Sequence, residues 1–437
     1  MNRKLTSVAG NQGVKTALTP KLRFPEFRDA PAWEEKKVGE LVSTVTPPKK
    51  LPTSSYLKKG SFPIIDQSQR EICGWTDDDK AVITEPLPVI VFGDHTCALK
   101  FVSQPFAQGA DGIKILNSRN KVSNEYLFHF LNFQPIVTEE YKRHFSILQE
   151  KKVAYSDIRI GEQQKIAEFL TTLDEVIAAQ SQKLDALKTH KKGLMQGLFP
   201  QEKESEKGEV RNDKRNQNSS FSLPNSNFSL PIPRLRFPEF QAAPEWLNKP
   251  LGELGEIITG KTPSTKESNL WRGDILFITP TDISEEDKYQ HTTARTVVET
   301  KSTKVLPEGS IVYTCIASIG KMALTVCPSI TNQQINAVVP NKKTAGEFVY
   351  YTLLNLTPWI KTISAVSTLP IINKTDFSKI AITYPEDKAE QQRIATCLTS
   401  LDDLITAQSA KLTALKTHKR GLMQQLFPSP IENSSQI

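Results

Sequence analysis

The strongest constraint on this chain is an internal duplication. The stretch "EQQKIAEFLTTLDEVIAAQSQKLDALKTHKKGLMQGLFP", from Glu162 to Pro200, returns from Glu390 to Pro428 with 28 of 39 positions identical. An earlier pair of segments begins at Leu22 and at Leu235, and it keeps 13 of 20 positions. The copies are 213 residues apart at the earlier pair and 228 at the later pair, so the second copy carries 15 more residues in its middle. Repeats of this length are duplicated domains, because solenoid units repeat every ~20–50 residues.

The duplication predicts two units, each with a globular part and a closing helix. A chain of 437 residues is long enough to bury two cores. The segment between the units is rich in Pro, Ser, Asn and charge, so it cannot offset the entropy of ordering and is expected to be a flexible linker. The expected segments are an N-terminal tail (1–19), a first domain (20–157), a first conserved helix (158–200), the linker (201–232), a second domain (233–385), a second conserved helix (386–428) and a C-terminal tail (429–437).

Each closing segment carries a narrow apolar seam whose positions step alternately by three and four residues. This 3.5-residue spacing is typical of a left-handed coiled-coil contact. An alternative is that each helix simply lies on the core of its own domain. Pairing is favoured because the two seams are identical and share one polar step, and Pro200 and Pro428 are expected to end the helices. The central seam positions are Leu170, Leu173, Ile177, Gln180, Leu184 and Leu187 in the first copy, and Leu398, Leu401, Ile405, Gln408, Leu412 and Leu415 in the second.

The middles of the two copies predict an α/β (α+β) fold. Short apolar runs rich in β-branched residues indicate strands within 86–93, 273–279 and 309–318. Amphipathic stretches at 123–134 and 345–356 indicate a matching helix in each copy, and each stretch ends shortly before a proline.

Composition narrows the class of protein without identifying it. The net charge is +7, yet positive residues exceed negative ones by only one in 20–157 and by two in 233–385, so charge alone does not predict a DNA-binding protein. No apolar run reaches the ~18 residues that span a bilayer. The N-terminus has no apolar signal-peptide core, and the five cysteines form no paired framework. A cytoplasmic location without membrane attachment is expected.

Two motifs invite a catalytic interpretation that their context does not support. The sequence "GEIITGKT" at 255–262 fits the phosphate-loop pattern, but Pro263 and a turn-like stretch follow where a helix is needed. The six histidines have no metal-ligand spacing, and "GDHTC" at 93–97 lacks the context of a nucleophile. Neither a catalytic residue nor a metal site is therefore expected in this chain.

Several segments in order resemble the DNA-specificity (S) subunits of type I restriction–modification enzymes. The two "EQQ" helix starts, "TGKTPST" at 259–265, "WRGDILFITPTDI" at 271–283, "ITNQQINAVVP" at 330–340 and "VIVFGDHTCALKFVSQPFAQGADGIKIL" at 89–116 carry this resemblance. It implies two globular target-recognition domains separated by two long antiparallel coiled-coil helices in a pseudo-twofold internal repeat.

The resemblance also implies the function. Each domain would bind one half of a bipartite target in double-stranded DNA, and the helices would set the spacer between the halves. The helices would also dock two modification (methyltransferase) subunits, which restriction (ATP-dependent nuclease/translocase) subunits join. No cofactor is expected in this chain, because S-adenosylmethionine, ATP and Mg would be bound by the partner subunits.

DNA contacts are expected from polar and basic loop residues, which hydrogen-bond base edges or phosphates. The candidates in the first domain are Lys49, Lys50, Lys58, Lys59, Gln67, Gln69, Arg70, His95 and Lys100. Those in the second are Lys261, Thr262, Ser264, Thr265, Lys266, Thr281, Lys321, Asn332 and Gln333.

Two other functions are compatible with the same pattern. One is the specificity component of another type of restriction–methylation enzyme, with similar domains but a fused partner. The other is a coiled-coil scaffold with two protein-binding domains and no DNA contact. DNA binding in the presence of the partner subunits distinguishes the scaffold from the other two.

Overall fold

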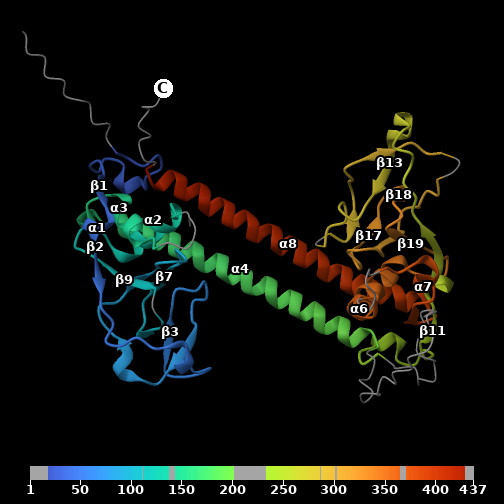
Figure 1. Ribbon diagram of the computed structural model, residues 1–437, viewed down its shortest axis with the longest axis horizontal. Coiled ribbons are helices and arrows are strands. Elements are labelled where there is room, and N and C mark those ends of the chain that lie inside the picture. Colours follow the sequence, from blue (N-terminus) through green and yellow to red (C-terminus); the bar gives the residue numbers. More distant parts are fainter. Residues whose placement is uncertain are drawn as a thin grey trace, which may run out of the picture. The chain divides into compact units, whose positions relative to one another are not determined.

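A computed structural model describes residues 18–110, 112–136, 143–200, 233–285, 287–300, 303–364 and 371–428. The expected linker and almost all of both tails lie outside these ranges. The chain divides into two compact units, with the boundaries inside the two long helices. The first unit contains residues 1–182 and 410–437, and the second contains residues 183–409. Each unit therefore includes a piece of both long helices (Figure 1).

The first unit is built from two four-stranded sheets and a short ribbon. One sheet is antiparallel, and its order is β2 (Val42–Val45), β9 (Ile113–Ser118), β6 (Val89–Gly93) and β7 (Leu99–Val102). The other is mixed, in the order β4 (Gly74–Thr76), β3 (Phe62–Ile65), β8 (Phe106–Gln108) and β5 (Val82–Ile83). The ribbon pairs β1 (Glu34–Lys37) with β10 (Lys152–Tyr155), and the helices are α1 (Val38–Leu41), α2 (Asn124–Phe133) and α3 (Phe145–Glu150).

The second unit repeats this plan, with one strand more in its larger sheet and one fewer in its smaller sheet. Its larger sheet has the order β12 (Gly255–Thr259), β19 (Ile335–Pro340), β16 (Ile311–Thr314), β17 (Met322–Thr325) and β14 (Tyr289–Gln290). Its smaller sheet has the order β15 (Thr296–Val297), β13 (Trp271–Ile278) and β18 (Ser329–Thr331). The ribbon pairs β11 (Leu247–Pro250) with β20 (Ala381–Tyr384), and the helices are α5 (Leu251–Leu254), α6 (Gly346–Ser364) and α7 (Lys374–Ser378).

The expected α/β fold is confirmed, with one difference in detail. The sequence predicts that the helix at 345–356 ends before Pro358, but α6 continues through this proline to Ser364. Proline removes one backbone hydrogen bond and disfavours the helix interior. Here Ile360, two residues after Pro358, is fully buried in the core of the unit, and this burial outweighs the local penalty.

The first turn of each long helix carries an equivalent buried ion pair. Glu162 starts α4 (Glu162–Leu198), and its carboxylate accepts hydrogen bonds from the Arg23 guanidinium at 2.6 and 2.8 Å and from the Trp33 indole at 3.0 Å. In α8 (Lys388–Leu426), Glu390 accepts the equivalent bonds from Arg236 at 2.7 Å, twice, and from Trp246 at 3.1 Å. In each unit, the repeated segment that begins at Leu22 or Leu235 thus contacts the repeated start of the long helix.

The end of each helix completes the core of the other repeat's domain. Phe427, after α8, packs against Phe130 of α2 with ring centroids 5.3 Å apart. Phe199, after α4, packs against Phe348 of α6 at 5.7 Å. Both phenylalanines are only 1% exposed. The helices therefore pack both on domain cores and on each other. Neither helix pairing nor packing on a core accounts for the apolar seam by itself.

The helices pack together in antiparallel directions within each unit (Figure 1). In the first unit, Asp174 of α4 pairs with Lys419 of α8 at 2.5 Å. In the second unit, Lys191 of α4 pairs with Asp402 of α8 at 2.5 Å. The twelve central seam residues are all buried or half-buried. Those below 9% exposure are Leu170, Leu184, Leu398, Leu401, Gln408 and Leu412. Their individual roles in pairing stay a prediction.

Candidate nucleic-acid interface

In the first domain, strand direction brings four loops to one edge. β3 and β8 are parallel, so the loops after both strands emerge on the same side. The end of β6 lies beside the start of β9, because Gly93 pairs with Ile113, and the end of β2 lies there too, because Val45 pairs with Ile115. We call this the first loop edge, and it consists of 46–50, 66–70, 94–98 and 109–110.

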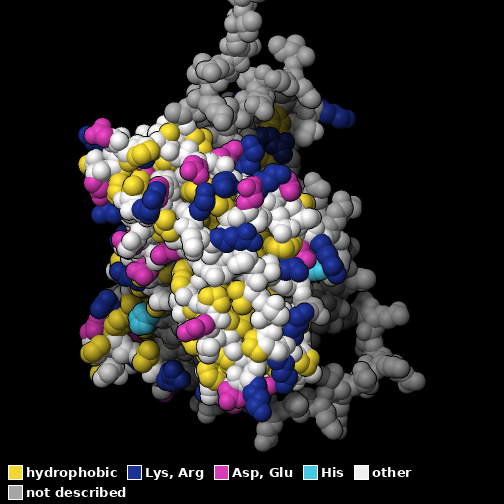
Figure 2. Space-filling view, turned by 90° about the vertical axis from the view of Figure 1, so that its left-hand side faces the viewer, with side chains coloured by type: hydrophobic (Ala, Val, Ile, Leu, Met, Phe, Trp, Pro, Cys, Tyr) yellow, Lys and Arg dark blue, Asp and Glu magenta, His cyan; other side chains and the backbone are white. Residues whose placement is uncertain are grey.

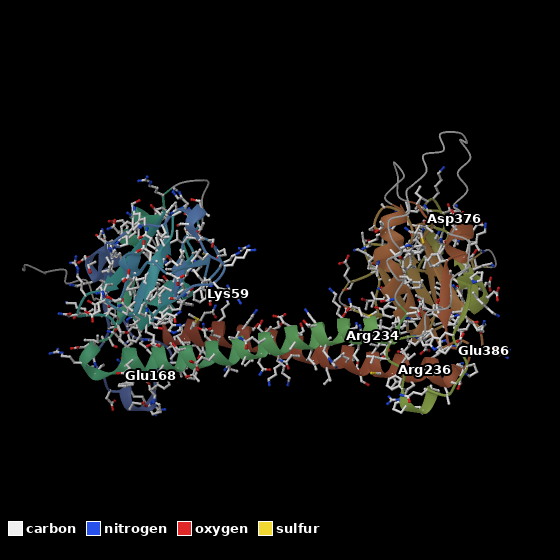
Figure 3. The ribbon with its side chains drawn as sticks, turned by 90° about the horizontal axis from the view of Figure 1, so that it is seen from below. Lys59, Glu168, Arg234, Arg236, Asp376 and Glu386 are labelled. Atoms are coloured by element: carbon white, nitrogen blue, oxygen red, sulfur yellow. The ribbon has the colours of Figure 1, made fainter. Side chains whose placement is uncertain are left out.

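Six of the nine candidates in the first domain lie on the first loop edge, namely Lys49, Lys50, Gln67, Gln69, Arg70 and His95. Lys100 lies on β7, just after the 94–98 loop. Lys58 and Lys59 precede β3 and therefore lie at its opposite end, and Lys59 extends from the outside of the domain (Figure 3). Lys49 is exposed and pairs with Asp78 at 2.6 Å, so a phosphate would have to compete with this carboxylate.

Lys100 has a different role from the expected one. Its side chain is buried, and its Nζ donates to the carbonyl oxygens of Asp66 at 2.8 Å and of Arg70 at 2.5 Å. These bonds close the 66–70 loop. The expected phosphate contact is therefore replaced by a structural contact, because a buried ammonium with two carbonyl partners is not presented to solvent.

The 66–70 loop is further stabilised by the carboxylate of Asp66. This group accepts hydrogen bonds at 2.8 Å from the Cys73 thiol and from the backbone N–H of Ser68. Burial opposes ionisation, but these hydrogen bonds and the charge of Lys100 outweigh it and hold the pKa of Asp66 below its ordinary value. Asp66 is therefore charged at neutral pH.

Gln67 joins this loop to its neighbour. Its carbonyl accepts a hydrogen bond from the Thr96 hydroxyl at 2.5 Å. Its side-chain Oε1 is buried and has no hydrogen-bond partner. Gly112 has a positive φ of 96°, and a Cβ there would lie 2.6 Å from this oxygen, so glycine is required for the close approach.

The second domain forms an equivalent edge. β13 and β18 are parallel, and Ile278 pairs with Thr331. The ends of β12 and β16 both lie beside the start of β19. We call this the second loop edge, and it consists of 260–266, 279–283, 315–321 and 332–334. It brings together all nine candidates of the domain, namely Lys261, Thr262, Ser264, Thr265, Lys266, Thr281, Lys321, Asn332 and Gln333.

Two loops of the second loop edge are in direct contact. The Thr262 hydroxyl donates to Gln333 Oε1 at 2.7 Å. Gly260 passes so close that a Cβ would lie 2.2 Å from the carbonyl oxygen of Asn332. Asn332 itself is 9% exposed, and its amide bonds Gln334 at 2.9 Å, so it shapes the loop, whereas Gln333 is exposed.

The phosphate-loop pattern at 255–262 does not form a phosphate loop. Its first residues form β12, and the chain then continues as the 260–266 loop and a 3-10 helix at Ser268–Leu270. No α-helix starts at Lys261 to direct its N-terminus at a phosphate. Within the described ranges, no group of His, Cys, Asp and Glu side chains is arranged to hold a metal ion. In the same ranges, every helix is too short or too polar to cross a bilayer.

Comparison with known proteins decides the family. The model for the type I restriction modification DNA specificity domain matches residues 31–189 and 244–417, which is more than half of the chain. The chain belongs to this family. Its members are the specificity subunits of type I restriction–modification systems, which are non-catalytic.

Individual relatives agree with this family. The chain is 34% identical over 168 residues to the type I restriction enzyme MjaIX specificity subunit of Methanocaldococcus jannaschii, which is 37% of this chain and 39% of that relative. It is 26% identical over 388 residues to the EcoR124I/EcoR124II specificity subunit of Escherichia coli, which is 84% of this chain and 86% of the relative. The crystal structure of an S subunit from M. genitalium shares the fold, with a TM-score of 0.63 at 17% identity, over 94% of this chain and 100% of that one.

The loop edges of this family member include residues that the sequence analysis missed. Arg143 is exposed beside the first loop edge, because the backbone of His144 bonds the carbonyl of Asp94 at 2.9 Å. Ile371 is 50% exposed beside the second, where it forms a β-bridge with Ile316. The basic run "YKRH" was a usable signal for Arg143. No sequence motif near Ile371 predicted its position, because it lies at the second loop edge only through its β-bridge with Ile316.

Charge does not clearly mark the face of the first domain that is seen in Figure 2. Figure 2 views the side of the molecule that carries the first domain, and there Lys and Arg side chains are interspersed with Asp and Glu. The near balance of charges counted along the sequence is therefore also a property of this surface. A DNA-binding interpretation must rest on the arrangement of the loops.

Proposed function

We propose that this chain is the sequence-specific DNA-binding subunit of a type I restriction–modification complex, and that each domain binds one half of a bipartite target. The observation that carries this proposal is the pair of loop edges. The same strands place polar loops at the same edge in both domains, while the sequences of these loops differ. A duplicated frame with different contact residues is what recognition of two different half-sites requires.

The long helices are proposed to set the spacer and to dock the modification subunits. Support comes from the antiparallel packing and from the contacts repeated in each unit, which give two similar surfaces for two identical partners. A helix of 37 residues spans about 55 Å at about 1.5 Å per residue, which is enough to separate two readers by one DNA turn of about 34 Å. Restriction subunits would join through the same complex.

The chemistry of the complex is assigned to its partners. S-adenosylmethionine, ATP and Mg would be bound by the modification and restriction subunits, and this chain would contribute recognition alone. A solved structure described as complex assembly and conformational transition of the type I R-M system has a TM-score of 0.50 to this chain. That description concerns the other protein, and membership of a similar complex is part of the proposal here.

The test is methylation-aware sequencing of DNA from cells that express the chain with its modification subunits and lack other methyltransferases. We expect one split motif with a fixed gap. Replacing residues 42–157 by the equivalent part of a relative should then change one half of the motif only. If both halves changed together, the domains would not act as independent readers.

The same experiment separates the alternatives. A coiled-coil scaffold would give no methylated motif and no DNA binding even with the modification subunits present. A specificity component of another enzyme type would need a fused partner, and methylation would not depend on separately supplied modification subunits. The purified chain alone should bind DNA weakly and transfer no methyl group.

A further inference from the structure

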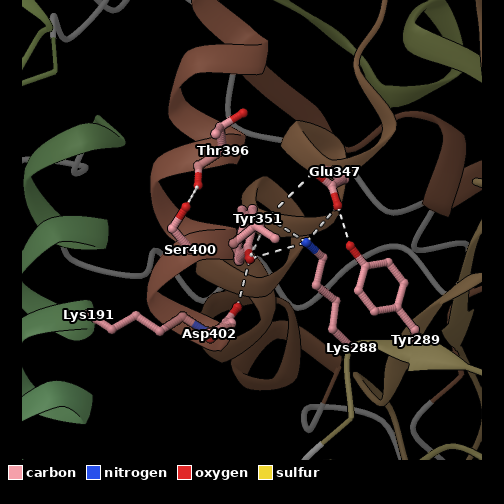
Figure 4. Close-up of polar contacts among 9 residues, drawn as sticks. Lys191, Lys288, Tyr289, Glu347, Tyr351, Thr396, Ser400 and Asp402 are labelled. Atoms are coloured by element: carbon pink, nitrogen blue, oxygen red, sulfur yellow. Dashed lines mark hydrogen bonds and ion pairs between the residues drawn. The ribbon is translucent and has the colours of Figure 1, made fainter. Parts of the chain in front are cut away.

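A lysine of the second domain is buried against both helices that border it. The side chain of Lys288 is 8% exposed. Its Nζ donates to Thr399 Oγ1 at 2.6 Å, to Glu347 Oε1 at 2.8 Å and to the Tyr351 hydroxyl at 3.3 Å. The same ammonium lies 4.9 Å from the ring centroids of Tyr289 and of Tyr351 (Figure 4). A buried charge is expensive, so this complete set of partners is needed to hold it.

The partners of Lys288 come from different elements. Lys288 immediately precedes β14, Glu347 and Tyr351 lie on α6, and Thr399 lies on α8. Glu347 also accepts a hydrogen bond from the Tyr289 hydroxyl at 2.5 Å. Burial opposes ionisation of Glu347, but Lys288 and Tyr289 outweigh it and hold its pKa below the ordinary value, so the pair is ionic. The ammonium therefore joins an outer strand of the sheet to the long helix.

This strand is in turn bonded to the second loop edge. Gln290 of β14 donates from Nε2 to the carbonyl oxygen of Asp282 at 3.2 Å. The Asp282 carboxylate accepts from the backbone N–H of Thr279 at 2.9 Å and from its hydroxyl at 2.5 Å. The loop at 279–283 is thus connected to α8 through two short steps, Asp282–Gln290 and Lys288–Thr399.

The first unit has the same helix contacts but not the lysine. Thr171 of α4 donates to Glu125 at 2.7 Å, as Thr399 contacts Glu347. Among the first unit's described residues, no lysine is paired with Glu125, and no strand corresponds to β14. The 66–70 loop is held by Lys100, from β7 of its own domain. The two loop edges therefore differ in what anchors them.

We propose that Lys288 is a positioning residue that fixes the 279–283 loop of the second domain against α8, and so fixes the phase of the second half-site relative to the spacer. This inference rests on the proposed function. If the loop could shift by one base-pair step, about 3.4 Å, the chain would also bind targets whose half-sites are one base pair further apart. An anchored loop would bind such targets poorly.

The experiment measures gap discrimination with the complete chain assembled with its modification subunits. The variants are Lys288→Met, Lys288→Arg and, as a matched control, Lys304→Met, because Lys304 is an exposed lysine of the second domain that pairs with Glu256. The dissociation constant is measured for duplexes with the native gap and with a gap longer by one base pair. We expect Lys288→Met to lower the ratio of the two constants about tenfold, the size of one poorly matched contact. Lys288→Arg should keep most of the ratio, and Lys304→Met all of it.

A purely structural role predicts a different result. Lost stability alone would weaken binding by the same factor at every gap and leave the ratio unchanged, and this outcome would overturn the proposal. If Lys288→Met does not fold, Thr399→Val removes one partner of the ammonium, and Thr171→Val is its counterpart in the first unit. Only Thr399→Val should lower the ratio, and an equal effect of both would also count against Lys288. If the proposed function were wrong, the wild-type chain itself would bind duplexes of both gap lengths equally.

Discussion

Lys191 of α4 and Asp402 of α8 form an ion pair at 2.5 Å, and exchanging the two repeats turns this pair into Lys419 and Asp174, which are also 2.5 Å apart. Both members of the first pair are about four-fifths buried. The hydroxyl of Tyr351 also donates to Asp402 at 2.7 Å, and His129 occupies the equivalent position near Asp174. Each long helix therefore carries an aspartate followed along the chain by a lysine. Antiparallel packing places each aspartate against the lysine of the other helix, whereas parallel packing would place like charges together.

Reversing one charge of this contact should destabilise the second unit. Asp402→Lys places two ammonium groups together in a site that is about four-fifths buried, and it should cost about 3 kcal/mol. The double variant Lys191→Asp with Asp402→Lys restores opposite charges and should recover a large part of this loss. Urea unfolding followed by circular dichroism measures both. A double variant no more stable than Asp402→Lys would show that the pair does not contribute through its charge.

His129 should make the first unit acid-sensitive. Its side chain is buried between Thr171 and Asp174, and burial, followed by the nearby Lys419 charge, lowers its pKa to about 4 despite the opposing effect of Asp174. Between this value and the ordinary value of about 6.5, the unfolded chain binds more protons, so stability rises with pH. The contribution should be complete above about pH 6.5 and lost as pH falls towards 4, by about 3 kcal/mol.

The comparison variant for this effect is His129→Gln, which cannot titrate. Its unfolding free energy should decline less between pH 6.5 and 4 than that of the unmodified chain. Parallel curves for the two proteins would assign the acid sensitivity to other groups.

Two residues of the second loop edge should fail in different ways. Gln333→Ala removes an exposed amide beside Thr262, and it should relax specificity at one position of the second half-site by about 1–3 kcal/mol. Lys266→Ala removes an exposed charge, and it should weaken binding to all sequences alike and reduce the log–log salt slope by about 0.9. Binding to a panel of single-base variants at several salt concentrations measures both. Changes in the first half-site with either variant would contradict the division of the target.

Lengthening both helices should widen the gap between half-sites. Inserting four residues after Ala179 and after Ala407 adds about 6 Å, or about one turn, to each helix. Both halves of the methylated motif should stay the same, while the gap grows by one or two base pairs at about 3.4 Å each. Replacing Leu184 and Leu187 by Asp should instead abolish the fixed gap, because charge is placed on the seam. An active insertion variant with an unchanged gap would show that the helices are not the spacer.

The sequence by itself determined the duplication, the fold class and the presence of the two long helices. Identical stretches and a 3.5-residue apolar period are properties of neighbouring residues, and the period specifies which helix face is buried. The repeated Arg, Trp and Glu can be found in the sequence, but no sequence pattern predicted that Arg23 and Glu162, 139 residues apart, form an ion pair.

Only the tertiary structure decided which partner each buried face has and which loops meet. Phe427 completes the core of the other repeat's domain, and an apolar period cannot specify whose core it is. In the sequence, Lys100 cannot be distinguished from an exposed loop lysine, and only the structure shows that it bonds the 66–70 loop. No sequence pattern predicted the burial of Lys288. The physical reason is that burial and hydrogen bonding of a polar side chain are set by distant segments, whereas periodicity and propensity act along the chain.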